Sequence, residues 1–170
     1  LLEGDALDGK HGLNPELVAL LGLWKPYLLV SNLPYAAGTP LLVNLLTGSQ
    51  PPERSVVMVQ HEVALRLTAG PGTKSYGALS VQMANVASGR ILQKVSPACF
   101  TPPPKVDSAL VELVRTPWQA DPVKLRHLLT LMFGQRRKSV GKKLLSLGIN
   151  PADFGIDPRS RAEELNPSVF

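Results

Sequence analysis

The stretch Tyr27–Tyr35 (YLLVSNLPY) decides the fold class of this chain. Its first six residues form a short apolar run that ends in a polar turn, which is typical of a buried parallel strand. Residues 39–46 then show helical spacing, and Pro40 suits the first turn of a helix. A strand followed by a helix is the unit from which parallel α/β sheets are built.

The alternation of strands and helices continues along the chain. Ser55–Gln60 predicts a second buried strand, and residues 61–68 and 76–87 predict two helices. Ile91–Val95 and Ser108–Val114 predict two more strands, which we expect to form an antiparallel edge. The sequence therefore predicts a layered α/β sheet.

The last third of the sequence has a different character. Residues 121–134 and 136–147 predict two helices, followed by short helices and loops. Gly141 falls inside the second helix, which it should weaken by about 1 kcal/mol relative to alanine. We expect two domains, residues 1–118 and residues 119–170.

The composition excludes several classes of protein. The 170 residues are 44% hydrophobic and 18% charged, which is typical of a soluble globular chain. The lone Cys99 excludes an intramolecular disulfide, and His11, His61 and His127 share no motif, so we expect no metal site. The sequence has neither an apolar run of membrane-spanning length nor a signal pattern, and we expect a cytoplasmic protein.

Positive charge is concentrated near the C-terminus. The net charge is +5, and residues 119–170 contain nine Lys or Arg against five Asp or Glu. Five of the eight residues in Arg136–Lys143 are basic. A localised basic patch attracts phosphates and so indicates a nucleic-acid partner, although a solvated helix face explains it equally well.

The most specific local signal is Asn32-Leu33-Pro34-Tyr35, directly after the first buried strand. Ligands of open α/β sheets bind beyond the carboxyl ends of the strands. The Asn32 amide and the Leu33 carbonyl offer two acceptors for an exocyclic amine, and Tyr35 can stack on the ring that carries it. This set suits a flipped adenine. The alternative is a simple turn at the end of a strand.

Two further segments carry candidate residues. Phe100 begins a proline-rich stretch and can supply the second face of a stacking sandwich, although a polyproline connector with a core phenylalanine is at least as common. Asp5, in Gly4-Asp5-Ala6, can accept a hydrogen bond from an adenine amine. Taken alone, Asp5 is a weak signal.

Together these segments closely resemble the KsgA-type ribosomal RNA adenine dimethyltransferases. The resemblance covers nearly the whole chain. Its motifs are GDAL (4–7), NLPY (32–35), MVQHEVALRL (58–67), SYGALSV (75–81), FTPPPKVDS (100–108), FGQRRKSVGKKL (133–144) and RAEEL (161–165).

The resemblance implies the C-terminal part of a Rossmann-like, SAM-dependent methyltransferase sheet with a small all-α C-terminal domain. The family transfers methyl groups from S-adenosylmethionine to the amines of two adjacent adenosines near the 3′ end of small-subunit ribosomal RNA. The implied target-base residues are Asn32, Leu33, Pro34, Tyr35 and Phe100, and Asp5 and Asn32 would contact the cofactor. The residues implied to contact RNA are Lys105, Arg136, Arg137, Lys138 and Lys142.

The resemblance also implies a monomer that needs no metal and acts on the small ribosomal subunit. In this family a glycine-rich loop and an acidic residue that hold the cofactor precede the GDAL motif. Because this chain begins at Leu1, we expect that half of the cofactor site to be absent from it. The alternatives are a non-catalytic RNA-binding or ribosome-assembly fragment, and an adenine methyltransferase acting on another nucleic acid.

Overall fold

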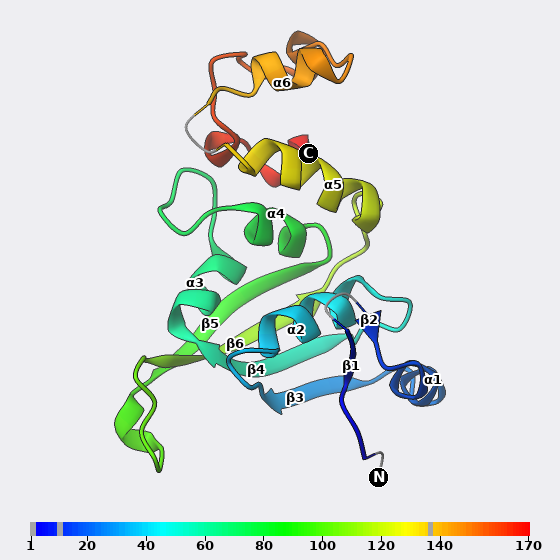
Figure 1. Cartoon of the computed structure of the whole chain (residues 1–170), viewed down its shortest axis with the longest axis vertical. Helices are drawn as coiled ribbons and strands as arrows, with labels where there is room; N and C mark the ends of the chain where they lie inside the picture. The colour runs from blue at the N-terminus through cyan, green and yellow to red at the C-terminus, as the bar shows by residue number, and fades with distance from the viewer. Residues whose placement is uncertain (1–2, 10–11, 136–137) are drawn as a thin grey trace. The chain divides into compact units, whose positions relative to one another are not determined.

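The computed structural model describes residues 3–9, 12–135 and 138–170 (Figure 1). The chain forms two compact units. The first comprises Leu1–Leu65 and Val86–Pro117, and the second comprises Arg66–Asn85 and Trp118–Phe170. A domain boundary at residue 118 stays a prediction for the protein as a whole.

A four-stranded mixed sheet forms the centre of the first unit. Its strand order is β3 (Leu28–Asn32), β4 (Arg54–Gln60), β6 (Ser108–Arg115), β5 (Ala87–Val95). Strands β3 and β4 are parallel and are connected through α2 (Gly38–Thr47), whereas β6 runs antiparallel to both of its neighbours. The predicted strand–helix alternation and the antiparallel pairing of the last two strands are confirmed.

Three short elements precede this sheet, and the sequence analysis predicted none of them. Strands β1 (Leu7–Asp8) and β2 (Gly12–Leu13) form an antiparallel ribbon. Helix α1 (Pro15–Leu23) follows, and the Asn14 side chain caps it by accepting a hydrogen bond from the Glu16 amide. Proline at the first helical position and an acidic residue in the first turn both favour a helix start here.

One face of the sheet is packed and the other is open. Alternate residues of the two central strands are buried on the packed face, namely Ser55, Val57 and Val59 from β4 and Ala109, Val111 and Leu113 from β6. Helix α2 contributes buried Leu42, Leu45 and Leu46 to the core of this unit. Helix α3 (His61–Thr68) follows β4 without a loop.

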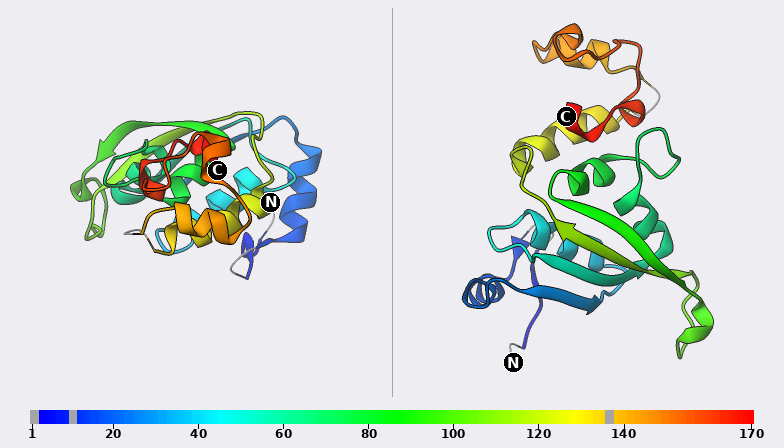
Figure 2. Two further views of the ribbon diagram at one scale, coloured as in Figure 1. Left: turned by 90° about the horizontal axis from the view of Figure 1, so that it is seen from above. Right: turned by 180° about the vertical axis from the view of Figure 1, so that it is seen from behind.

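Strand β3 differs from the sequence prediction. It was predicted to be buried, but Leu28 is 66% exposed and Val30 is 79% exposed. Seen from behind, no described helix of the first unit covers this side of the sheet (Figure 2). Among the described strands, β3 lies at the edge of the sheet and pairs only with β4.

An ion-pair cluster lies on the same open face. The Glu112 carboxylate accepts a hydrogen bond from Arg90 Nε at 2.6 Å and lies 3.7 Å from Arg54 Nη1. Strand register places Arg90 of β5 directly opposite Glu112 of β6, and Arg54 of β4 diagonally across from it. The Glu112 side chain is only 12% exposed, so its charge is compensated where it is shielded from water.

The second unit is helical. Its elements are α4 (Ala78–Ala84), α5 (Pro122–Phe133), α6 (Gly141–Ser146), η2 (Pro151–Phe154), η3 (Ala162–Glu164) and η4 (Pro167–Val169). Asp121 caps α5 by accepting hydrogen bonds from the backbone amides of Val123 and Lys124. These bonds hold the pKa of the Asp121 carboxyl below its usual value. The predicted helix at 121–134 is confirmed.

Tyr76 organises the core of the second unit. It is fully buried, and its hydroxyl donates a hydrogen bond to the Leu165 carbonyl at 2.8 Å. Burial raises the pKa of Tyr76 to about 12. The ring meets Phe133 edge-on at 6.3 Å between centroids, and Phe133 in turn contacts Phe170 at 5.8 Å. Residues far apart in the sequence thereby share one core.

The predicted helix at 76–87 is shorter in the structure. Helix α4 begins after Gly77, whose amide donates to Ser80 Oγ. It ends at Ala84 and is followed by Asn85, whose side chain forms hydrogen bonds with the backbone of Gln119 and Ala120. Ala87 already belongs to β5, which starts four residues earlier than predicted. Pairing with β6 outweighs the weak strand preference of residues 88–90.

The prediction for Gly141 is wrong. This glycine is the first residue of α6, because Val140 and Gly141 donate backbone hydrogen bonds to Ser160 and Pro158. A Cβ at Gly141 would lie 2.6 Å from the Pro158 carbonyl oxygen. The close approach of the two backbones requires glycine here.

Candidate functional site

The turn after β3 is fixed by its own backbone. The Leu33 amide donates to the Met58 carbonyl at 3.1 Å, which extends the parallel pairing one residue beyond the strand. The Leu33 side chain is only 3% exposed and anchors the turn in the core. Leu33 therefore contributes its carbonyl, rather than its side chain, to any ligand at this edge.

Gly38 allows α2 to begin directly over this turn. Its amide donates to the Pro34 carbonyl at 2.7 Å. A Cβ at Gly38 would lie 2.8 Å from the Leu33 Cβ, closer than side chains pack. The turn is therefore held against the helix by a close contact that only glycine permits.

Two polar groups at this edge have no internal partner. The exposed Asn32 amide and the Leu33 carbonyl have no hydrogen-bond partner among the described residues. Tyr35 is 37% exposed, and its hydroxyl forms a 2.6 Å hydrogen bond with Ser108 Oγ. The structure thus places two acceptors and one aromatic ring in successive residues of a fixed turn, a set that suits an aromatic ring bearing an amine.

Phe100 lies in the connection between β5 and β6. It follows the short helix η1 (Pro97–Cys99), and its amide donates to the Pro97 carbonyl at 3.1 Å. In the described part of the chain, no ring contact joins Phe100 to Tyr35. The role of Phe100 as a second stacking face stays a prediction.

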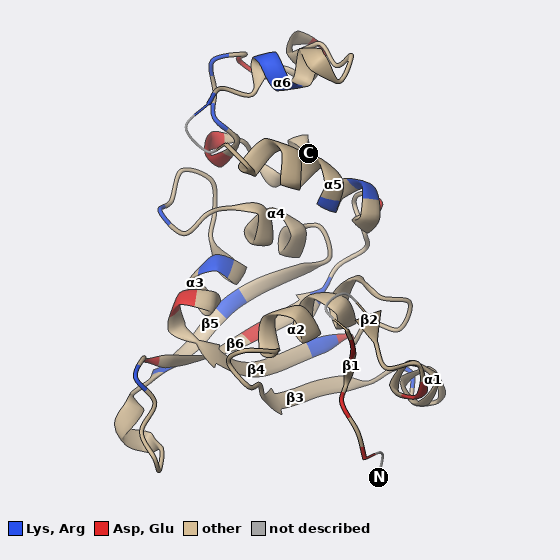
Figure 3. Ribbon diagram, in the orientation of Figure 1, with Lys and Arg blue, Asp and Glu red and all other residues tan. Residues whose placement is uncertain are grey.

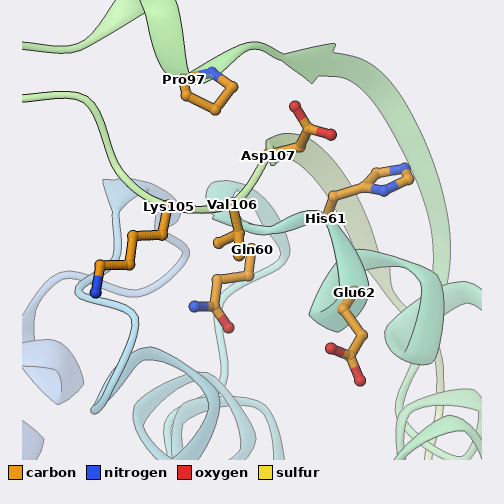
Figure 4. A pocket seen from close by; sticks show the side chains of 7 residues that line it. All are labelled: Gln60, His61, Glu62, Pro97, Lys105, Val106 and Asp107. Carbon is orange, nitrogen blue, oxygen red and sulfur yellow. The ribbon is translucent and has the colours of Figure 1, made fainter.

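A cavity of about 360 Å³ opens at the carboxyl end of β4 (Figure 4). It is lined by Gln60, His61, Glu62, Pro97, Lys105, Val106 and Asp107. Asp107 is paired with Lys94 at 2.7 Å and accepts the His61 amide through its carbonyl. Lys105 has no ion-pair or hydrogen-bond partner among the residues that the structure describes, so its ammonium can meet a phosphate.

One carboxylate oxygen of Asp5 accepts a hydrogen bond from within the chain. Its Oδ1 accepts a hydrogen bond from the Leu7 amide at 2.9 Å, and its carbonyl accepts one from Asn14 Nδ2. These bonds fix an exposed carboxylate whose Oδ2 has no partner in the described segments. No described contact joins Asp5 to Asn32, so a shared cofactor site for the two stays a prediction.

The second unit contains a basic cavity of about 390 Å³. It is lined by Gln135, Lys138, Ser139, Lys142, Lys143 and Ser146. Basic residues are visible along α6 and the segment that leads to it (Figure 3). Arg136 and Arg137, which were also predicted to contact RNA, lie outside the described residues.

The three lysines of the basic cavity are not equivalent. Lys143 Nζ donates to the carbonyls of Leu131 and Met132 at 2.8 and 3.0 Å, at the C-terminal end of α5. Desolvation, with the nearby charge of Lys138, lowers the pKa of Lys143. Lys143 is therefore a structural cation, whereas Lys138 and Lys142 have no such bonds within the described ranges.

The described residues contain no group of three or more His, Cys, Asp or Glu side chains that could hold a metal ion. Over the same residues, no helix is both long and apolar enough to cross a membrane. The lone Cys99 is exposed.

Sequence reasoning missed three residues that shape these sites. Ser108 and Gly38 hold the turn that carries Asn32, and Lys143 stabilises the end of α5. A buried serine at the start of an otherwise apolar strand was the signal for Ser108. Nothing in the local sequence distinguishes Lys143 from its neighbour Lys142.

The chain has a methyltransferase fold. Its mixed sheet carries unpaired polar groups at the carboxyl ends of the parallel strands. The fold of the chain is similar to that of a dimethyladenosine transferase from Plasmodium falciparum. The TM-score is 0.72, and the identity is 21% over 83% of this chain and 62% of that one. The chain also resembles the 23S rRNA methyltransferase ErmE, with a TM-score of 0.62 and 21% identity over 85% of this chain and 62% of that one.

The chain belongs to the ribosomal RNA adenine dimethylase family, whose sequence profile matches residues 12–167. It is 42% identical to the ribosomal RNA small subunit methyltransferase A of Phenylobacterium zucineum over 175 residues, which cover all of this chain. The match spans 59% of that relative's length. The family assignment confirms the resemblance drawn from the motifs.

Proposed function

We propose that this chain supplies the target-base pocket and the RNA-contacting surface of an adenine dimethyltransferase. The enzyme transfers methyl groups from S-adenosylmethionine to two adjacent adenosines near the 3′ end of small-subunit ribosomal RNA. The observation that carries this proposal is the fixed turn Asn32–Tyr35, with two unpaired acceptors beside an aromatic ring.

The chemistry requires positioning rather than a general base. The Asn32 amide oxygen and the Leu33 carbonyl accept the two N–H groups of the adenine amine. They thereby aim its lone pair away from the protein backbone, while Tyr35 stacks on the base. Holding the reacting atoms in line removes much of the entropic cost of a bimolecular step.

The cofactor supplies an electrophilic methyl group on a sulfonium. The residues present fit one part of it, because Asp5 is fixed by Leu7 and keeps one carboxylate oxygen for an adenine amine. Asn32 would lie between the cofactor and the target base. We propose no metal in this reaction, because a sulfonium methyl needs no Lewis acid.

RNA binding is assigned to both units. Lys105 at the cavity beside β4, and Lys138 and Lys142 at the basic cavity, would each contact a backbone phosphate. Each phosphate contact releases counterions, so binding should weaken as salt rises. Replacing one of these lysines by alanine should lower the salt slope by about one unit.

Asn32→Ala tests the central assignment. We expect loss of methyl transfer to small-subunit particles, with RNA binding nearly unchanged. Asn44→Ala is the matched control, because the amide nitrogen of Asn44 in α2 is buried and has no hydrogen-bond partner in the described ranges. Transfer by Asn32→Ala at a rate close to that of the unaltered protein would refute the assignment.

A non-catalytic role for the chain makes a different prediction. If the chain acts only in RNA binding or ribosome assembly, it binds small-subunit particles in a salt-dependent way without any cofactor. A calorimetric titration with S-adenosylmethionine separates the two roles, because saturable binding favours the enzyme and no binding by the folded chain favours the non-catalytic role.

The substrate is the third point to test. One protein of similar fold is a 23S rRNA methyltransferase. A pocket for adenine does not by itself determine which RNA is the substrate. Comparing methyl incorporation into small-subunit RNA, large-subunit RNA and DNA would separate them, and we expect the first to dominate. We further propose that the protein acts as a monomer in the cytoplasm.

A further inference from the structure

The side chains of Tyr35 and Ser108 join two motifs that are 73 residues apart. The Tyr35 hydroxyl and Ser108 Oγ lie 2.6 Å apart. Tyr35 belongs to the turn after β3, and Ser108 is the first residue of β6, at the end of the proline-rich connection. Both residues belong to the first unit.

The two partners differ in exposure. Ser108 is fully buried, whereas 37% of Tyr35 remains accessible. The hydrogen bond therefore fixes the polar end of the Tyr35 ring to a side chain that is shielded from water. A hydrogen bond in such surroundings is stronger than one in water. The rest of the ring stays available to a ligand.

Burial of a serine in this sheet does not by itself recruit a partner. Ser55 on the neighbouring strand β4 is also fully buried, and its Oγ has no hydrogen-bond partner among the residues described. The bond from Ser108 therefore reflects the placement of Tyr35 rather than a general need to satisfy buried hydroxyls here. Ser55 also provides a matched control.

We propose that Ser108 is a positioning residue that sets the angle of the Tyr35 ring for stacking on the target base. Ser108 itself does not contact the base. The inference rests on the proposed function, since it specifies how the turn Asn32–Tyr35 is prepared for an adenine. It also links the Phe100–Ser108 connection to this turn, although no ring contact among the described residues joins Phe100 to Tyr35.

The first test uses the chain alone, without RNA. Labelling with 3-fluorotyrosine gives three ¹⁹F signals, from Tyr27, Tyr35 and Tyr76, and Tyr35→Phe identifies the second. We expect Ser108→Ala to shift or broaden the Tyr35 signal and Ser55→Ala to leave it unchanged. An unchanged Tyr35 signal in Ser108→Ala would overturn the inference.

The second test measures base capture. The probe is an RNA oligonucleotide with 2-aminopurine next to a target adenosine, so that the target keeps its 6-amine and the neighbouring fluorescence changes when the target base leaves its stack. We expect Ser108→Ala and Tyr35→Phe each to weaken capture about fivefold, because a ring that is no longer held in advance must be ordered when the base binds. Because both remove the same bond, the double variant should lose no more than either single variant.

The outcomes separate the inference from the proposed function. Capture by Ser108→Ala equal to that of the unaltered chain, or additive losses in the double variant, would overturn the inference alone. No capture by the unaltered chain would overturn the proposed function, and with it any role of Ser108 in stacking. If Ser108→Ala does not fold, Tyr35→Phe carries the test, because it leaves the buried serine in place.

Discussion

Replacing Gly141 by alanine should destabilise the second unit, although alanine is the better helix former. The new Cβ would lie 2.6 Å from the Pro158 carbonyl oxygen, 2.7 Å from its Cβ and 2.9 Å from its Cα. Ordinary contacts begin near 3.4 Å, so the two backbones must separate. The hydrogen bond from the Gly141 amide to the same carbonyl, 3.0 Å long, would stretch with them.

The magnitude follows from two opposing effects. Overpacking of this kind costs about 1–3 kcal/mol. Alanine gains at most about 1 kcal/mol over glycine in a helix interior, and less at a first helical residue. We therefore expect a net loss of about 1–2 kcal/mol in the free energy of unfolding, measured by urea denaturation.

Gly70→Ala is the matched control for this measurement. Gly70 belongs to the same unit and does not have a positive φ, and a Cβ added to it would meet no atom within 4 Å. Its replacement should change stability by less than about 0.5 kcal/mol. A gain in stability for Gly141→Ala would refute the close approach of residues 141 and 158.

Three further contacts are tested by substitution. Lys143→Met removes two hydrogen bonds at the end of α5 and should cost about 1–2 kcal/mol in urea unfolding, whereas Lys142→Met should leave stability unchanged and lower the salt slope of RNA binding. Tyr76→Phe should weaken the second unit by about 1 kcal/mol. Because the folded pKa of Tyr76 is about 12 against 10 unfolded, its contribution is complete below pH 10 and is lost as the pH rises towards 12, so this variant should lose less stability in alkali. Gly38→Ala should displace the Leu33 turn and reduce target-base capture, measured by 2-aminopurine fluorescence, more than it reduces RNA binding. Equal reductions would argue against a rigid turn.

Elements with strong local patterns could be predicted from the sequence. Strand β4 and helix α3 have the predicted bounds to within one residue, because a short apolar run and helical spacing are local properties. The start of β5 could not be predicted in this way. Residues 88–90 pair with Glu112–Val114, and a partner more than 20 residues away leaves no mark on the local pattern.

The residues of the candidate site also divide into those with a local sequence signal and those that depend on distant contacts. Asn32 and Tyr35 could be identified because their residue types and their place after a strand already suit an adenine. The hydrogen bond between Ser108 and Tyr35 could not be predicted, since it depends on how β6 aligns with β4. The exposure of Leu28 and Val30 was also missed, because hydropathy shows that a strand prefers burial but not whether a second layer covers it.

The bond between Tyr76 and Leu165 has a consequence for synthesis of the chain on the ribosome. The acceptor is made 89 residues after the donor, a delay of roughly 4–18 s at elongation rates of about 5–20 residues per second. Throughout that interval this bond cannot form, so the helical unit cannot close while it emerges. The sheet strands β3 to β6 are all made before Leu165, and they can pair before the helical unit is complete.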